Sequence, residues 1–182
     1  MNDAERIRVA SANDVAALLG GGLQGELVEM LAASPRFAPR LRAAAQRRLG
    51  ELSAGEPAAL ALTPAGLSDI VRRAGAVWHA AAIARVVDTS GRRHLMASLG
   101  SDVYAIALEG RGLAPAEAVV APDRDDWAAA ATSDGACCWS AWRTLQPPAV
   151  ASRLALLGCN VLPARIHQVF GPAIIDWLLD RP

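Results

Sequence analysis

Three histidines are the side chains of this chain best suited to general acid–base chemistry near neutral pH. His79, His94 and His167 lie at least 15 residues apart, and each falls in a segment predicted to be helical. A catalytic histidine needs a nucleophile or an orienting carboxylate within hydrogen-bond reach, and the chain has no G-x-S-x-G nucleophile motif. We therefore predict packed histidines, no catalytic residue and no enzymatic activity. The alternative is a helical enzymatic or small-molecule-binding domain with a cavity beneath His79 or His167.

Cysteines are the second group that could do chemistry, as metal ligands or as a disulfide framework. Cys137, Cys138, Cys159 and His167 together could surround a zinc ion, but their spacing contains no C-x-x-C pair. Neighbouring cysteines form a disulfide only through a strained ring, and the total of three is odd. The sequence thus favours buried thiols that pack as small hydrophobic groups, with no metal site.

Cation, nucleotide and cofactor sites are disfavoured by the same kind of argument. The acidic cluster within residues 123–126 lacks the spacing of an EF-hand and is better explained as charge at a helix N-terminus. Gly20, Gly22 and Gly25 fit G-x-G-x-x-G, but neither a credible strand before them nor an acid about 20 residues beyond completes a dinucleotide site. All 18 basic residues are arginine, and without lysine there is neither a P-loop nor a Schiff base. No cofactor is expected.

Composition predicts the kind of elements that must position these residues. The chain has 182 residues, 53% of them hydrophobic and 20% charged, so it can bury a core. It contains 40 alanines and 22 leucines against 24 valines, isoleucines and threonines, which favours helix over sheet. We predict one all-α domain over residues 1–182, compact and irregular, with about seven to nine helices.

Turn residues and apolar spacing divide the chain into segments. We predict one long buried helix from Thr63-Pro64 to Val87, and a loop or hinge at residues 50–62. A helix is expected over residues 123–145 with a break at Asp134-Gly135, and a C-terminal helical tail over 163–182 with a break at Gly171-Pro172. The other predicted helices cover residues 13–19, 23–33, 36–49, 92–99, 101–108 and 149–157.

Charge and hydropathy indicate where the protein acts. The formal net charge is zero, and a generic nucleic-acid binder would carry a basic face, so no nucleic-acid partner is expected. The N-terminus has no signal-peptide pattern, and the longest apolar region, residues 74–87, is too short to span a bilayer. We expect a cytoplasmic protein.

Tryptophan is unusually frequent for an aromatic residue in this chain. Five tryptophans stand against two phenylalanines and one tyrosine. Most are expected in the core, but an exposed tryptophan beside an arginine is a preferred hot spot of protein interfaces. We predict a protein interface that includes Trp142, Arg143, Arg92 and Arg93.

Two stretches of the chain carry a resemblance to a known family. The first is AGAVWHAAAIARVVD at residues 74–88, followed by residues 95–100 and 103–108. The second is DGACCWSAW at residues 134–142, followed by residues 145–148 and 153–156. Together they resemble the SctK/YscK family of cytoplasmic accessory proteins of bacterial type III secretion systems, and the second is similar to the family's Gly-x-x-Cys-Leu-x-x-Trp segment and the turn after it. Cys138 stands where the family often has an aliphatic residue. The matches cover about residues 70–160, roughly half of the chain.

The resemblance implies a structural adaptor rather than an enzyme. Family members link the forkhead-associated-like cytoplasmic domain of the inner-membrane ring protein, SctD, to SctQ, the C-ring-like component of the sorting platform. The expected position is then the cytoplasmic face of the inner membrane, reached through protein partners only. Arginine in place of lysine suits such a role, because a guanidinium group can form two hydrogen bonds with a partner's carboxylate.

Overall fold

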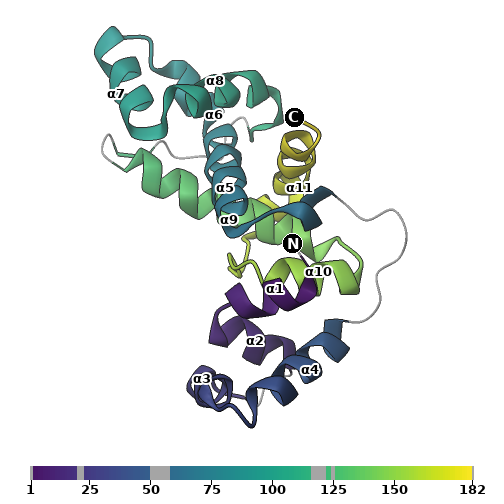
Figure 1. Ribbon diagram of the computed structural model, residues 1–182. Coiled ribbons are helices and arrows are strands. Elements are labelled where there is room, and N and C mark those ends of the chain that lie inside the picture. Colours follow the sequence, from purple (N-terminus) through teal and green to yellow (C-terminus); the bar gives the residue numbers. More distant parts are fainter. Residues whose placement is uncertain (1, 20–22, 50–57, 116–121, 124–125, 182) are drawn as a thin grey trace. The chain divides into compact units, whose positions relative to one another are not determined.

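The computed structural model describes residues 2–19, 23–49, 58–115, 122–123 and 126–181, and helices make up most of them (Figure 1). Within these ranges there are eleven α-helices, two short 3₁₀ helices and no strand. The predicted all-α class is confirmed, with a helix number above the predicted seven to nine. Among the described helices, none is both long enough and apolar enough to cross a membrane.

The helices divide between two compact units of the chain. The first unit comprises Met1–Pro64 and Leu145–Gly158, and the second comprises Ala65–Thr144 and Cys159–Pro182. The first holds α1 (Asp3–Val9), α2 (Ala12–Leu19), α3 (Gly25–Ala33), α4 (Ala38–Leu49), η1 (Ala58–Ala61) and α10 (Pro148–Ala155). The second holds α5 (Pro64–Trp78), α6 (Ala80–Arg85), α7 (Thr89–Leu99), α8 (Ser101–Glu109), η2 (Gly110–Leu113), α9 (Trp127–Thr144) and α11 (Arg165–Leu179). Whether they form one domain, as the sequence predicts, stays a prediction.

An apolar core and specific caps define the helices of the first unit. The buried cluster joins α1 to α4 and the segment after α10: Ile7, Val15, Ala16, Val28, Ala45, Leu49 and Leu156. A capping box starts α1, because the Asn2 side chain accepts from the Glu5 N–H and the Glu5 carboxylate accepts from the Asn2 N–H. At the start of α2 the Ser11 hydroxyl accepts from the Asp14 N–H, so this helix begins slightly before the predicted residue 13.

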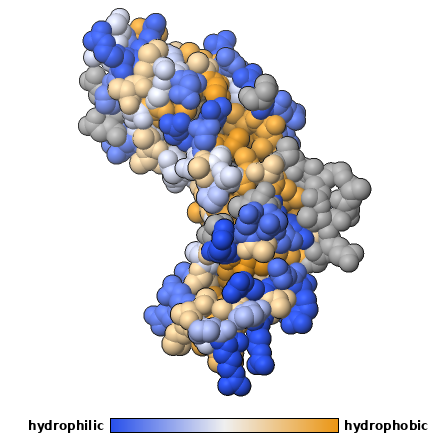
Figure 2. All heavy atoms as spheres, in the orientation of Figure 1, coloured by the Kyte–Doolittle hydropathy of each residue, from blue (hydrophilic) through white to orange (hydrophobic). Residues whose placement is uncertain are grey.

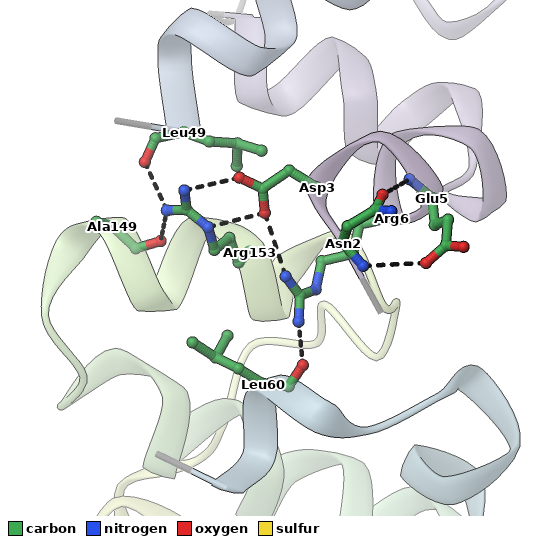
Figure 3. Close-up of polar contacts among 8 residues, drawn as sticks. All are labelled: Asn2, Asp3, Glu5, Arg6, Leu49, Leu60, Ala149 and Arg153. Carbon is green, nitrogen blue, oxygen red and sulfur yellow. Dashed lines mark hydrogen bonds and ion pairs between the residues drawn. The ribbon is translucent and has the colours of Figure 1, made fainter. Parts of the chain in front are cut away.

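A buried ion network ties the two sequence-distant parts of this unit together (Figure 3). Arg153 of α10 binds both carboxylate oxygens of Asp3, from Nε at 2.9 Å and from Nη2 at 2.8 Å. Its Nη1 donates to the carbonyl of Leu49 at 2.9 Å, and Arg6 also binds Asp3, at 3.2 Å. Arg6 further donates to the carbonyl of Leu60. Both guanidinium groups are buried, and the Arg6 and Arg153 residues are 4% and 2% exposed, so these bonds replace their hydration.

The second unit is assembled by close contacts between helices at small residues. Gly75 of α5 lies so close to α9 that an added Cβ would be 1.7 Å from the carbonyl oxygen of Ala131. Gly135 of α9 meets α5 in the same way, 1.8 Å from the carbonyl oxygen of Val71. The most extensive helix pairing joins α9 to α11, where an added Cβ at Gly171 would be 2.8 Å from the Cα of Cys138. These positions account for glycines inside helices, where they are otherwise unfavourable.

Three predicted boundaries inside this unit are wrong. The helix predicted from 64 to 87 stops at Trp78 and restarts at Ala80, because His79 has φ −89° and ψ 7° and leaves the helical backbone. Helix α9 runs through Asp134-Gly135 without a break, since packing on Val71 holds Gly135 in place. Helix α11 likewise contains Pro172, and the buried Ile174 and Ile175 anchor the part beyond it.

Other predictions fall partly outside the described residues. Of the predicted loop at 50–62, residues 50–57 lie outside them, and residues 58–61 form η1. Gly20 and Gly22 of the glycine motif and Asp125 of the acidic cluster also lie outside. The predicted C-terminal helix is confirmed as α11, which belongs to the core of the second unit.

Candidate functional site

A cluster of one aspartate and two histidines lies inside the second unit. His79 comes from the junction of α5 and α6, Asp134 from the middle of α9, and His167 from the first turn of α11. The Nε2 atom of His79 is 2.8 Å from Asp134 Oδ2, and the Nε2 atom of His167 is 3.1 Å from Asp134 Oδ1. One carboxylate therefore joins three helical segments whose residues lie up to 88 positions apart in the sequence.

Aromatic rings cover both imidazoles of this cluster. Trp78 stacks on His167, with ring centroids 4.1 Å apart and planes 13° from parallel. His79 and Trp127 meet edge to face, with ring centroids 6.0 Å apart. Both histidines are buried, whereas 27% of the Asp134 side chain is exposed. The imidazoles thus sit in an apolar shell, and the carboxylate is the part of the cluster that reaches the surface.

The two histidines favour the ionised form of Asp134. Burial acts to raise the pKa of this carboxyl, but the hydrogen bonds and charges of His79 and His167 together outweigh it. The pKa of Asp134 is therefore held below its ordinary range. Because an ionised carboxylate only accepts hydrogen bonds, the Nε2 atom of each imidazole is the donor in its bond to Asp134.

The geometry around the cluster does not supply a reactive group. The Nδ1 atoms of His79 and His167 are buried and have no hydrogen-bond partner among the described residues, so neither imidazole holds a hydroxyl or thiol ready for deprotonation. Burial, followed by the nearby charge of Asp134, raises the pKa of the Cys137 and Cys138 thiols. A thiol with a raised pKa is a poor nucleophile and a poor metal ligand at neutral pH.

The described residues are also poorly arranged to bind a metal ion. Within the described ranges, no group of three or more His, Cys, Asp or Glu side chains is arranged to hold a metal ion. Cys137, Cys138 and Cys159 are not joined in disulfides, and the Nε2 atoms of His79 and His167 already bind Asp134. The two hydrogen bonds of Asp134 therefore connect the α5–α6 junction, α9 and α11 inside the second unit.

This cluster was not predicted from the sequence because its three members are far apart in the chain. Neither histidine has a carboxylate within four residues in the sequence that could orient it, and Asp134 binds both in the structure. One signal was present in the sequence. Asp134 is the single acidic residue of helix α9, and a carboxylate largely removed from water needs hydrogen-bond partners.

A pocket of about 630 Å³ lies in the first unit, away from any histidine. Its walls include the buried side chains of Ile7, Val15 and Val28, and charged residues of α1, α3 and α4 also line it. The volume is within the range of small-molecule pockets. This pocket is distinct from the cavity that the sequence suggests beneath His79 or His167.

The residues of the predicted interface have different environments. Arg92 and Arg93 are exposed on α7, and Arg92 donates to the carbonyls of Val86 and Val87. Trp142 is only 3% exposed, and its indole N–H donates to Asp176 at 2.6 Å. Trp142 is therefore not the exposed aromatic side chain that the prediction requires, because it packs in the core between α9 and α11.

Arg143, the fourth residue of the predicted interface, is half-buried. Its guanidinium group donates to the side-chain oxygen of Asn160, within the same unit. Its role at an interface stays a prediction, as does that of Arg92 and Arg93.

A second exposed arginine surface lies on α4, in the first unit. Figure 2 shows strongly hydrophilic side chains projecting at the bottom of the view, where Figure 1 places α3 and α4. We define the α4 arginine surface by five exposed residues: Arg36, Arg40, Arg42, Arg47 and Arg48.

Comparisons with protein-family models, curated proteins and solved structures find no match to this chain.

Proposed function

We propose that this protein is a non-enzymatic adaptor of a bacterial type III secretion system, located in the cytoplasm at the inner membrane. It links the forkhead-associated-like cytoplasmic domain of the SctD-like ring protein to the C-ring-like SctQ component. The resemblance of residues 74–108 and 134–156 to the SctK/YscK family suggests these partners.

One observation carries the adaptor role, namely that each compact unit exposes its own arginine surface. The first unit has the α4 arginine surface, and the second has Arg92 and Arg93 on α7. Val87 and Met96, both exposed, lie close to Arg92 and Arg93 in the chain. Arginine and methionine are enriched where proteins meet. Two such surfaces on two units suit a molecule that holds two partners at once.

The non-enzymatic part of the proposal rests on the cluster of the second unit. Both histidines bind Asp134, and the Nδ1 atoms of both imidazoles are buried and shielded from substrate by the surrounding apolar groups. General acid–base catalysis requires a group that can reach the reacting atom. The cluster serves folding rather than turnover.

The test is pairwise titration calorimetry of the full chain against the ring protein's cytoplasmic domain and against the C-ring-like component. We expect saturable binding of both at micromolar concentration or tighter. The double variant Arg92→Glu/Arg93→Glu is expected to weaken the binding of one of the two partners by about tenfold while the chain stays folded. Failure of both partners to bind the full chain would refute the adaptor role.

The pocket of the first unit favours a second candidate function, small-molecule binding. Its volume and partly apolar walls suit a ligand of modest size. A ligand that binds only the folded state raises the unfolding temperature, so a thermal-shift screen tests this candidate. A stabilising compound whose effect disappears in Ala32→Trp, which places a large side chain at an exposed position of the pocket wall, would support it, and a screen without any such compound would refute it.

A further inference from the structure

The α4 arginine surface concentrates positive charge that the rest of the chain does not balance locally. Five of the 18 arginines fall within residues 36–48, and residues 30–50 contain no Asp or Glu. The whole chain has zero net charge. None of the five arginines has an ion pair among the described residues, whereas Arg72, Arg73 and Arg181 on the second unit each pair with an acid.

Local helix stability explains only part of this surface. Arg47 and Arg48 lie in the last turn of α4, where the helix dipole favours positive charge. Arg40 lies in the first turn, where the dipole disfavours it, and that turn contains no acidic residue. Arg36 precedes the helix, and no acidic residue lies between it and Arg40.

Two arginines of this surface, Arg40 and Arg47, point away from the core against which α4 packs. Ala45 and Leu49 are buried on the inner side, and the helical repeat places Arg40 and Arg47 on the opposite side. Seven residues separate these two arginines, which corresponds to about 10.5 Å along the helix axis. A partner helix with acids seven residues apart would present carboxylates at the same spacing.

Exposed apolar side chains accompany the arginines. Phe37 is 40% exposed, and the guanidinium carbon of Arg36 lies 5.7 Å from its ring centroid. Met30 on the neighbouring helix α3 is 66% exposed. Aromatic residues, methionine and arginine are the residue types enriched in protein–protein interfaces.

Other anionic partners fit this surface less well. An amphipathic helix that binds a membrane inserts its apolar side, and the apolar side of α4 is already buried against the first unit. A nucleic-acid surface gains most of its affinity from many released counterions, but α4 offers a short basic segment in a chain of zero net charge.

We propose that the α4 arginine surface docks an acidic, amphipathic helix of a protein partner. Carboxylates of that helix pair with Arg40 and Arg47, and its apolar side chains cover Phe37. This inference rests on the proposed function in one respect, namely that the ligand is a protein. It adds the chemistry of the partner that the first unit would bind.

The probe is a fluorescein-labelled helical peptide of about 20 residues with glutamates along one face and leucines beside them. Fluorescence anisotropy with the full chain should give saturable binding that weakens as salt is raised. Arg40→Glu/Arg47→Glu should weaken binding by about tenfold or more. The matched control, Arg111→Glu/Arg165→Glu, makes the same charge change at exposed positions of the second unit and should have little effect.

Two further probes separate the kinds of anionic partner. Vesicles with about 30% phosphatidylglycerol and a DNA duplex of about 20 base pairs should bind more weakly than the peptide. Tighter binding of either, lost in Arg40→Glu/Arg47→Glu, would overturn the proposal in favour of a membrane or a nucleic acid. No saturable peptide binding, or an equal loss in both double variants, would also overturn it. Circular dichroism and thermal unfolding confirm that both variants fold.

The same variants distinguish this inference from the adaptor role. A chain that binds the peptide through Arg40 and Arg47 but neither the ring protein domain nor the C-ring-like component refutes the adaptor role and supports the docking surface. A chain that binds both proteins, with neither affected by Arg40→Glu/Arg47→Glu, and that does not bind the peptide refutes the docking surface alone.

Discussion

Replacing Asp134 by asparagine tests whether the aspartate–histidine cluster stabilises the second unit. The change keeps the size of the side chain but removes the negative charge that both Nε2–H groups contact. The substituted amide could still accept from one histidine through its oxygen, while the other histidine loses its acceptor.

The expected loss of unfolding free energy at pH 7 is about 2 kcal/mol, since a hydrogen bond to a charged group contributes about 1.5–3 kcal/mol. Asp134 makes two such bonds, at 2.8 and 3.1 Å, but its side chain is 27% exposed, and solvent screening reduces the contribution of each. The bond that the asparagine retains reduces the net loss further.

Tryptophan fluorescence during urea unfolding is the appropriate assay, because all five tryptophans belong to the second unit. The transition therefore reports that unit even when the first unit unfolds separately. Asp102→Asn is the matched control, because Asp102 is exposed and lies 3.9 Å from Arg73, a surface pair expected to contribute less than about 0.5 kcal/mol.

The pH dependence of the unfolding free energy provides an independent test of the same prediction. The folded-state pKa of Asp134 lies below the unfolded value of about 3.9, so its stabilisation is complete above that pH. It is lost as pH falls through the folded-state pKa, and the difference between wild type and Asp134→Asn should shrink accordingly. Equal stability of the two proteins at pH 7, or a difference that persists after the pH has fallen through the folded-state pKa of Asp134, would refute the reasoning.

Three further predictions concern other parts of the molecule. Gly75→Ala should destabilise the second unit by about 3 kcal/mol in the same fluorescence assay, since its Cβ would overlap the Ala131 carbonyl; an unchanged transition would contradict the close contact. Arg153→Met should cost about 2–3 kcal/mol, below the ~3–5 kcal/mol of a fully buried unpaired charge, because Asp3 is 30% exposed and keeps Arg6 as a partner. Hydrogen exchange should accelerate in α1 and α10, and exchange unchanged in both helices would contradict this. Cys138 should not react with a thiol reagent at pH 8 until the protein unfolds, so it should be labelled more slowly than half-buried Cys137. Fast labelling of Cys138 in the folded protein would show that this thiol is accessible and would contradict the prediction.

Helical class was predictable because alanine and leucine dominate the chain and because local signals end several helices. Gly100 ends α7 with φ 93°, as a glycine at that position predicts. Predictions failed where contacts distant in sequence decide the outcome. His79 interrupts the predicted long helix and binds Asp134, 55 residues away, and no periodicity within residues 64–87 contains that information.

The candidate site was predictable only in part for the same reason. Arg92 and Arg93 are exposed, as an interface residue must be, and arginine pairs in a polar segment favour exposure. The burial of Trp142 depends on Asp176 of α11, which offers its indole a hydrogen bond inside the second unit. The helical repeat of residues 36–49 predicts from the sequence alone that Arg40, Arg47 and Arg48 face away from Leu49, and all three are exposed. The same repeat predicts Phe37 on the inner side, whereas Phe37 precedes α4 and is 40% exposed.

The adaptor role is tested most directly by assembling all three proteins. The full chain, the ring protein's cytoplasmic domain and the C-ring-like component are mixed and separated by size-exclusion chromatography with light scattering. The account predicts one species that contains all three proteins and that requires the full chain for its formation. Two separate binary complexes, or a ring protein domain and C-ring-like component that displace one another from the chain, would contradict it.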